Sequence, residues 1–363
     1  MTRYAISEIS SLAVRGRHAG RPGPLALFWT GAGIEINVTG SELSVELTAD
    51  HGSYEPWIEI VVDGCLVQRR MLERGRQTVG VFRGMEKSSV RNVKILKATQ
   101  APSSDPDSCL LIDAVLTDGE FMPVAPRAKK LEVIGDSITS GEGLCGSTGE
   151  NSWAAGVFGA VGGYPYLLGE ALDADVSVIS QSGYGVCYSW CGDPADTIPP
   201  YYDEVCGVLK GEKNEKLGAH EPWDFASWQP DWIVINLGTN DSGAFDNAPL
   251  FFSGRNRTRL EPDGSMNEED RQRIVHGTRD FLKHLREKNP GSYLLWCYGM
   301  IGGRMEETLR EAVNMYRKET GDERADFFVL AETAADEFGS RGHPGVPAHR
   351  KAAELLAKKL RSL

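Results

Sequence analysis

The chain has 363 residues, of which 41% are hydrophobic and 25% are charged. These fractions are typical of a soluble globular protein, and the length favours two domains over one. The formal net charge of -12 at pH 7 argues against nucleic acid or an anionic membrane surface as a partner, because both bind basic faces. A neutral substrate fits this charge better.

The start of the chain, residues 1–20, holds no sustained apolar run, and no later segment is long and apolar enough to cross a bilayer. We therefore expect a cytoplasmic protein, unless a leader precedes this sequence. Seven cysteines are an odd number for a disulfide framework and favour reduced thiols. Cys187, Cys191 and Cys206 cluster without a Cys-x-x-Cys pair, so we expect packing residues there, with no metal and no cofactor.

The first third of the chain alternates polar and apolar residues in short runs broken by turn residues. Asp63-Gly64 is typical of a hairpin turn. Without helices between them, such strands predict an antiparallel sandwich, and we expect a jelly roll over residues 1–125. The expected strands are 25–29, 33–38, 43–47, 57–62, 77–82, 93–96 and 110–115.

The proline-marked segment 122–130 ends this pattern, and we place the domain boundary between residues 125 and 126. Beyond it, strand-like and helical runs alternate, which predicts an α/β domain over residues 126–363. We expect three layers, a doubly wound parallel sheet with helices on both faces. The expected strands are 131–134, 176–179, 232–236, 293–297 and 327–330, and the expected helices are 164–172, 201–209, 268–288, 306–318 and 348–360.

In a sheet of this kind, ligands bind beyond the carboxyl ends of the strands. Ser137 follows the first expected strand, Gly183 the second and Asn240 the third, while His343 lies just before the last helix. A serine hydroxyl needs a base to become a nucleophile, and a tetrahedral oxyanion needs hydrogen-bond donors. Ser137 alone would suit an ordinary helix cap, but the other three stretches favour a catalytic site.

These stretches resemble the SGNH or GDSL-type hydrolases. The family's conserved blocks look like Gly135-Asp136-Ser137, Ser182-Gly183, Gly238-Thr239-Asn240-Asp241 and His343-Pro344, in that order, and the match covers roughly residues 131–363. The resemblance implies that Ser137 is the nucleophile and His343 its general base. It also implies an oxyanion hole made of the Ser137 N–H, the Gly183 N–H and the Asn240 side-chain amide.

The leading sandwich, Ser182-Gly183-Tyr184-Gly185-Val186 and the segment 198–201 together resemble carbohydrate esterase family 2. Members of that family remove acetyl groups from polysaccharide hydroxyls. The resemblance therefore implies a serine esterase that acts on an acetylated carbohydrate through an acyl-enzyme. Two alternatives stay open, a general short-chain esterase or thioesterase and a catalytically decayed carbohydrate-binding protein.

One position departs from the family pattern. Many members carry an aspartate three residues before the histidine, to orient the imidazole, whereas this chain has Ser340. A backbone carbonyl could orient His343 instead, as in some members of family 2. The Ser340 hydroxyl, a carboxylate such as Glu142 and an inactive site are the alternatives, and we expect the carbonyl.

Aromatic side chains are the best candidates for substrate recognition, because flat rings stack on the apolar faces of sugars. We assign Tyr184, Trp190 and Asp241 to substrate binding and expect Trp190 to be exposed to substrate. Trp153 and Trp223 are further candidates near the second and third strand ends. His349 begins the last helix, and we expect it to be structural.

Overall fold

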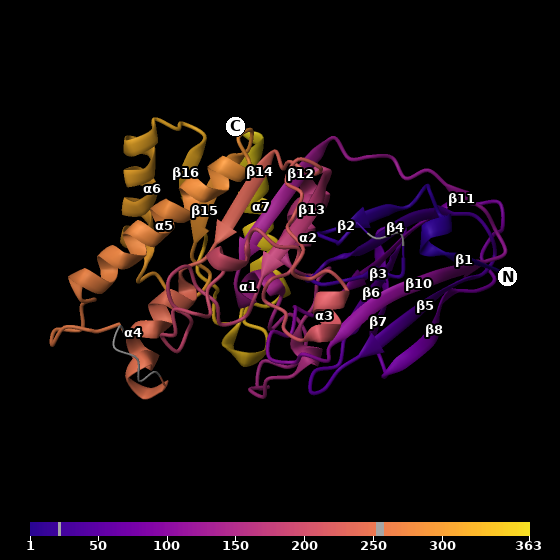
Figure 1. Cartoon of the computed structure of the whole chain (residues 1–363), viewed down its shortest axis with the longest axis horizontal. Helices are drawn as coiled ribbons and strands as arrows, with labels where there is room; N and C mark the ends of the chain where they lie inside the picture. Colours follow the sequence, from indigo (N-terminus) through magenta and orange to yellow (C-terminus); the bar gives the residue numbers. More distant parts are fainter. Residues whose placement is uncertain (21–22, 252–257) are drawn as a thin grey trace. The chain divides into compact units, whose positions relative to one another are not determined.

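The computed structural model describes residues 1–20, 23–251 and 258–363. The chain divides into two compact units, whose elements are labelled in Figure 1. Unit 1 contains Met1–Ala128, Ser152–Val161 and Asp203–Trp223, and unit 2 contains Lys129–Asn151, Gly162–Tyr202 and Asp224–Leu363. The predicted boundary, between residues 125 and 126, lies just before Ala128, after which the chain first passes from unit 1 to unit 2. Two later segments, Ser152–Val161 and Asp203–Trp223, return to unit 1.

Unit 1 contains two antiparallel sheets. The first has the order β1 (Thr2–Ala5), β10 (Cys109–Thr117), β5 (Leu43–Asp50), β8 (Gly75–Phe82), with β3 (Leu25–Ala26) also on β10. The second has the order β11 (Phe121–Met122), β4 (Gly33–Val38), β9 (Arg91–Lys97), β6 (Trp57–Val62), β7 (Cys65–Met71), with β2 (Ala13–Arg15) also on β4. The predicted antiparallel β domain is confirmed, and each of the seven expected strands overlaps an observed one. The jelly-roll connectivity stays a prediction.

The apolar residues of these strands occur at every second position, and this alternation places them in one core. Ile34 and Ile36 of β4 and Val45 and Leu47 of β5 are all fully or almost fully buried in it. The expected hairpin turn joins β6 to β7, and both of its central residues have positive φ angles, as a two-residue turn with the right twist requires. The sandwich is therefore built from the period-two pattern of its sequence.

The two returning segments are held by buried polar groups of unit 1. The indole Nε1 of Trp29 donates to the Val205 carbonyl over 2.7 Å. The buried Glu59 carboxylate accepts from the N–H groups of Ala160 and Val161, at 3.0 and 2.7 Å. These contacts tie distant parts of the chain to the sandwich.

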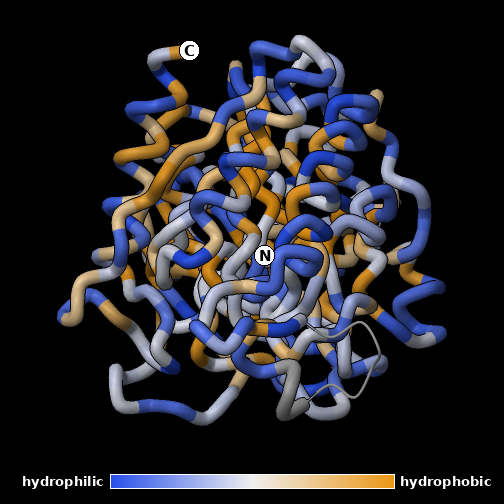
Figure 2. Tube along the Cα trace, turned by 90° about the vertical axis from the view of Figure 1, so that its left-hand side faces the viewer, coloured by the Kyte–Doolittle hydropathy of each residue, from blue (hydrophilic) through white to orange (hydrophobic). Residues whose placement is uncertain are grey.

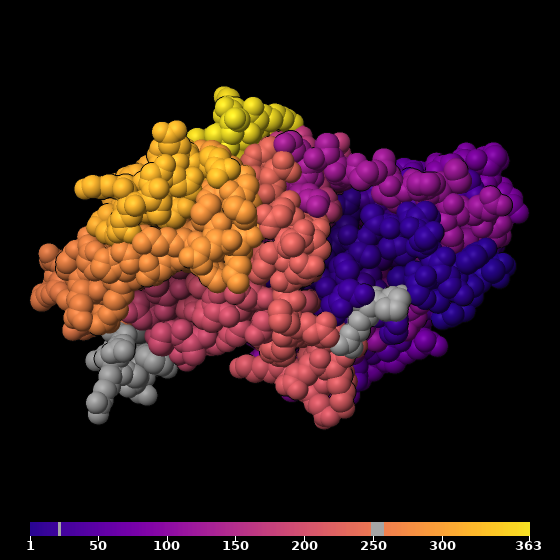
Figure 3. Space-filling view, turned by 45° about the horizontal axis from the view of Figure 1, so that its top comes forward, coloured from indigo at the N-terminus to yellow at the C-terminus, as the bar shows by residue number. Residues whose placement is uncertain are grey.

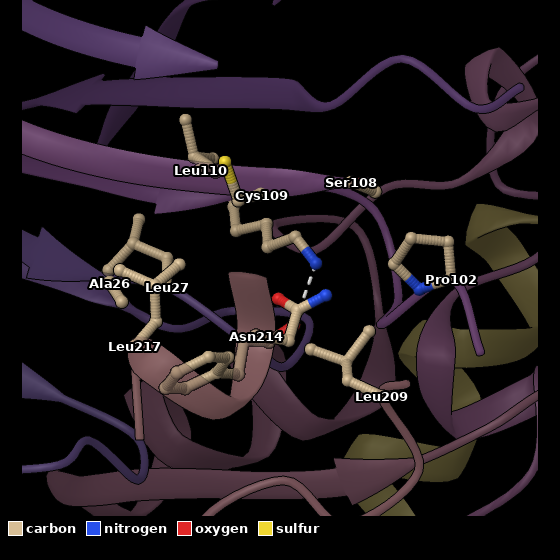
Figure 4. Close-up of a pocket in the computed structure, with 11 residues that line it drawn as sticks. Ala26, Leu27, Pro102, Ser108, Cys109, Leu110, Leu209, Asn214 and Leu217 are labelled. Atoms are coloured by element: carbon tan, nitrogen blue, oxygen red, sulfur yellow. Dashed lines mark hydrogen bonds between the residues drawn. The ribbon is translucent and has the colours of Figure 1, made fainter. Parts of the chain in front are cut away.

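Unit 1 also encloses a small cavity of about 10 Å³ beside Lys97 (Figure 4). The Lys97 side chain is fully buried, and its Nζ donates to the carbonyls of Phe28 and Gln100 over 2.6 and 2.8 Å. Burial lowers the pKa of Lys97 to about 8. The two carbonyls compensate part of this cost, so the lysine links the strand β9 to two loops.

Unit 2 is built on a parallel sheet of five strands, as predicted. The order is β13 (Ala174–Ser180), β12 (Lys129–Gly135), β14 (Trp232–Asn236), β15 (Tyr293–Tyr298), β16 (Ala325–Val329). The chain builds outward from β12 in both directions, first to β13 and then to β14. Because ligands bind where the strand order reverses, the expected crevice lies at the carboxyl ends of β12 and β14.

Helices cover both faces of this sheet. Tyr164 and Leu168 pack with Leu131, Val133 and the apolar side of the last helix in one buried cluster. On the other face, Phe281 meets the ring of Trp296 edge to face. The helices are α1 (Ser137–Ser140), α2 (Tyr164–Leu172), α4 (Thr239–Phe251), α5 (Glu268–Lys288), α6 (Glu306–Thr320) and α7 (Val346–Arg361).

The figures show how these layers are arranged. In Figures 1 and 3, α5 and α6 lie side by side, in orange to yellow, on the outside of unit 2. Figure 2 shows that hydrophobic residues gather inside the traced chain and hydrophilic ones on its outer turns. The long amphipathic helices were predictable because one face of each meets this interior.

The predicted helix over 201–209 is wrong. The 3-10 turn η3 (Pro199–Tyr201) is followed by an irregular segment and the short helix α3 (Glu212–Lys216). Val205, Val208 and Leu209 are buried in this segment of unit 1. Their spacing looked helical, but contacts with residues far away in the sequence determine their backbone.

Candidate active site

Ser137 is presented by the turn that follows β12. The Asp136 side chain accepts from the Ile138 N–H over 3.0 Å and so caps the short helix α1, of which Ser137 is the first residue. Asp136 is completely buried, and this burial raises the pKa of its carboxyl to about 7. The capped turn fixes the Ser137 side chain at the carboxyl edge of the sheet.

His343 contacts the serine directly. Its Nε2 lies 2.9 Å from the Ser137 Oγ, and its Nδ1 lies 3.0 Å from the Arg341 carbonyl oxygen. A neutral imidazole that donates from Nδ1 leaves Nε2 as an acceptor, which is the arrangement a general base needs. The structure therefore brings together the predicted nucleophile and base, with a backbone carbonyl as the orienting partner.

The other proposed partners of the imidazole are occupied elsewhere. The Ser340 hydroxyl donates to the Cys145 carbonyl over 2.8 Å. The Glu142 carboxylate is 3.9 Å from Nε2 of His343, on the side of the ring that faces the serine. Of the alternatives open at the sequence level, the carbonyl is the one that the geometry supports.

The two predicted oxyanion-hole residues follow the neighbouring strands. Gly183 lies beyond β13 with φ +82°, and a Cβ at this position would meet the Trp190 Cδ1 at 2.8 Å. The Asn240 amide follows β14 and donates to the Tyr184 carbonyl over 2.8 Å and to Asp136 over 3.3 Å. These contacts hold the amide beside the turn that carries the serine, and its role in the reaction stays a prediction.

The assignment of Asp241 to substrate binding is wrong. Its side chain is completely buried, and burial raises the pKa of its carboxyl. The carboxylate accepts from three successive backbone N–H groups, those of Val186, Cys187 and Tyr188, at 2.9, 2.8 and 3.0 Å. Asp241 therefore holds the loop that follows Gly183.

The predicted aromatic residues are in different environments. Tyr184 is only 5% exposed and its hydroxyl donates to Asp196 over 3.2 Å, so the expectation that its ring offers a stacking surface is corrected. Trp190 is 44% exposed, as expected, and its contact with substrate stays a prediction. Trp153 and Trp223 belong to the returning segments of unit 1, and their role in substrate recognition stays a prediction.

His349 is structural, as predicted. It is completely buried, and its Nδ1 accepts from the Tyr164 N–H, the first of α2, over 3.0 Å. The Gly163 that precedes this helix has no side chain to cap it, so His349 supplies the missing acceptor. Burial, with His343 nearby, lowers the pKa of His349 to about 3.

The sequence interpretation left two residues of the site without a role. Arg341 supplies the carbonyl that orients His343, and the Ser182 hydroxyl donates to Glu142 over 2.7 Å. A backbone carbonyl can come from any residue type, so Arg341 had no signal in the sequence. Ser182 lies in the recognised Ser-Gly pair, and its side chain could have been considered.

No cluster of three or more metal-ligating side chains occurs among residues 1–20, 23–251 and 258–363. Over the same part of the chain, the structure contains no helix with the length and apolarity needed to span a membrane. All seven cysteines are unpaired in the structure, and their redox state stays a prediction.

Comparison with known proteins identifies the family of this chain. The model of the GDSL-like lipase/acylhydrolase family matches residues 133–351. The solved structure of an acetyl xylan esterase, Est2A, from the rumen bacterium Butyrivibrio proteoclasticus is 40% identical in sequence, with a TM-score of 0.97 over 100% of this chain and 99% of that chain.

Two further relatives are more distant. A family two carbohydrate esterase from Clostridium thermocellum shares the fold, with 23% identity and a TM-score of 0.79 over 97% of this chain and 98% of its own. The cellulase/esterase CelE of Acetivibrio thermocellus is 24% identical over 92% of this chain, which spans only 37% of the length of CelE. The match to the family model and the likeness to Est2A show that the chain belongs to the GDSL-like lipase/acylhydrolase family.

Proposed function

We propose that this protein is a serine esterase that removes O-acetyl groups from a carbohydrate through an acyl-enzyme intermediate. The main support for the proposal is a pair of hydrogen bonds, one between the Ser137 Oγ and the His343 imidazole and one between that imidazole and the Arg341 carbonyl. Membership of an acylhydrolase family gives the class, a carboxylic ester hydrolase. The name of Est2A supports an acetylated carbohydrate as substrate.

The geometry accounts for both halves of the reaction. The Ser137 Oγ attacks the acetyl carbonyl carbon while His343 Nε2 takes the hydroxyl proton, and the imidazolium then protonates the departing sugar oxygen. Water then attacks the acetyl-serine carbonyl carbon with the same histidine as base, the bond from that carbon to the Ser137 Oγ breaks, and the imidazolium returns its proton to Oγ as acetate leaves. The N–H groups of Ser137 and Gly183 and the Asn240 amide are the expected donors to the oxyanion, where loss of one donor typically costs about 10²–10³ in kcat.

Trp190 is the residue that we assign to the sugar. The residue is 44% exposed, and its ring lies beside Gly183, one of the expected oxyanion donors. An exposed indole offers a flat apolar face to the C–H groups of a sugar ring. The acidic net charge of the chain suits a neutral polysaccharide better than an acidic one.

The test measures acetate release from an activated acetyl ester and from acetylated oligosaccharides. The wild type, Ser137→Ala and a control, Ser362→Ala, are compared, because the Ser362 hydroxyl is exposed and donates to the nearby Lys359 carbonyl. We expect the control to equal the wild type and Ser137→Ala to lose turnover. A folded wild type that hydrolyses neither substrate would refute the proposed function, and a Ser137→Ala variant with a tenth of the activity would exclude Ser137 as nucleophile.

The two alternatives are separated by further measurements. A general short-chain esterase would prefer butyryl over acetyl esters, whereas we expect acetyl to be preferred. A decayed binding protein would bind glycan without turnover. That alternative was based on the missing aspartate. The Arg341 carbonyl accepts a hydrogen bond from His343 in its place, so the missing aspartate is no longer a reason to expect an inactive site.

A further inference from the structure

A buried carboxylate lies at the catalytic centre without a step in the mechanism above. Glu142 follows α1, and its side chain is only 3% exposed. Its Oε1 accepts from the Arg341 Nε and its Oε2 from the Ser182 hydroxyl, both over 2.7 Å. A buried carboxylate is unfavourable unless it is paired and hydrogen-bonded, so these two contacts are what allow Glu142 to remain there.

The backbone around Glu142 packs directly against the turn that carries the catalytic histidine. The Glu142 N–H donates to the Ser137 carbonyl over 3.0 Å, and the Gly143 carbonyl accepts from the Ser340 N–H over 3.1 Å. A Cβ on Gly143 would lie 2.5 Å from the His343 Cβ. The position of Glu142 is therefore fixed relative to both members of the Ser137–His343 pair.

Arg341 has a backbone conformation that is unfavourable for its residue type. Its φ angle is 59°, in the left-handed region, which costs roughly 1–2 kcal/mol for a residue with a Cβ. Three contacts hold it: its N–H donates to the Glu150 carbonyl over 2.7 Å, its Nη1 to the Asn151 carbonyl over 2.6 Å, and its Nε to Glu142. The same residue presents the carbonyl that His343 Nδ1 contacts, so its conformation sets the direction of the imidazole.

We infer that Glu142 is a positioning residue of this active site, which holds Arg341 in the conformation that directs its carbonyl oxygen at His343 Nδ1. The same carboxylate accepts a hydrogen bond from the Ser182 hydroxyl and so also fixes the residue before Gly183. On the Nδ1 side of the ring, a negative charge thus supports the histidine through one intervening residue, where other serine hydrolases place it directly on that nitrogen. On the other side, the same carboxylate lies 3.9 Å from Nε2. The inference rests on the proposed esterase function and names how its base is oriented.

The first test compares kinetics on a small activated acetyl ester. Glu142→Gln keeps the shape of the side chain but loses the charge that holds Arg341. We expect kcat to fall by at least about tenfold, and by less than the ~10⁴-fold that follows loss of a directly orienting aspartate, with KM nearly unchanged. Glu337→Gln is the matched control, because its carboxylate pairs with Lys351 and not with the dyad. Equal kcat values for Glu142→Gln and the control would overturn the inference.

The second test uses the backbone of Arg341. Arg341→Gly adopts a positive φ without strain and keeps the carbonyl, whereas Arg341→Ala keeps the strain and loses the contacts that compensate it. We expect Arg341→Gly to retain at least about threefold more kcat than Arg341→Ala. Equal kcat values in the two variants would show that the backbone conformation does not matter.

The third test does not depend on turnover. The ¹⁵N shifts of the His343 imidazole report which nitrogen of the neutral ring carries the proton. We expect Nδ1 to carry it in the wild type, and the Nδ1-protonated fraction to fall in Glu142→Gln but not in Glu337→Gln. An unchanged fraction would overturn the inference. If the wild type proved inactive on acetyl esters, the proposed function would fail, and this measurement would still decide the role of Glu142.

Discussion

Acidification should destabilise the folded protein through His349. The His349 Nδ1 accepts a hydrogen bond from the Tyr164 N–H at the start of α2. A proton on Nδ1 would remove this acceptor and bring the new Nδ1–H into repulsive contact with the Tyr164 N–H. The positive end of the helix dipole opposes the same charge. The folded protein therefore binds this proton only near the lowered pKa of about 3, whereas the unfolded chain binds it near 6.5.

The sign and size of the effect follow from these two values. Between pH 6.5 and pH 3 the unfolded chain binds more protons, so the free energy of unfolding falls as the pH falls. Two pKa values that differ by about 3.5 correspond to about 5 kcal/mol when the effect is complete. At pH 5 the loss contributed by His349 should be about 2 kcal/mol relative to pH 7.5.

Urea denaturation of the wild type and of His349→Gln at pH 7.5, 6.5, 5.5 and 5 measures this loss. The glutamine oxygen can accept the Tyr164 N–H but does not titrate, so only the wild type should lose the 2 kcal/mol. The raised pKa of Asp136, about 7, acts in the opposite sense, because its burial favours the folded state at low pH. That contribution is common to both proteins and cancels in their difference. Parallel pH curves for the two proteins would refute the reasoning.

Three further outcomes follow from the site. Asn240→Ala should lower kcat by about 10²–10³ with little change in KM, and steady-state kinetics that show only a higher KM would place the amide in substrate binding. Gly183→Ala should destabilise the fold by about 1–2 kcal/mol in urea denaturation and raise KM for oligosaccharides, because its Cβ would displace Trp190; an unchanged stability and KM would contradict this. Asp241→Ala should cost at least about 3 kcal/mol by the same measurement, because three backbone N–H groups lose their acceptor, and a loss below about 1 kcal/mol would argue against that role.

The elements predicted best are those whose sequence pattern is set by one buried face. The ends of α2, β14 and α5 coincide with the predicted ones. The strand β7 was missed because it is an edge strand, with Leu66 and Val67 exposed, so it lacks a regular alternation. Local pattern is therefore a reliable guide only where an element buries one face regularly.

In the active site, too, some features could be predicted from the sequence and others could not. Ser137 and His343 could be predicted because their chemistry requires particular side chains in particular contexts. The partner of His343 could not be identified with certainty, since a carbonyl leaves no trace in residue type. The burial of Asp241 and Tyr184 depends on the loop after Gly183, whose course is set by tertiary contacts.

The two segments that return to unit 1 constrain how this protein can be made and recombined. When a ribosome has released the sandwich strands, Glu59 and Trp29 still lack Ala160, Val161 and Val205, which are synthesised about a hundred residues or more later. Folding of the first unit can therefore be completed only after Lys129–Asn151 and Gly162–Tyr202 of the second have been translated. A gene cut between residues 125 and 126 would likewise separate these groups from their partners, so neither half could be exchanged between relatives as a ready-made module.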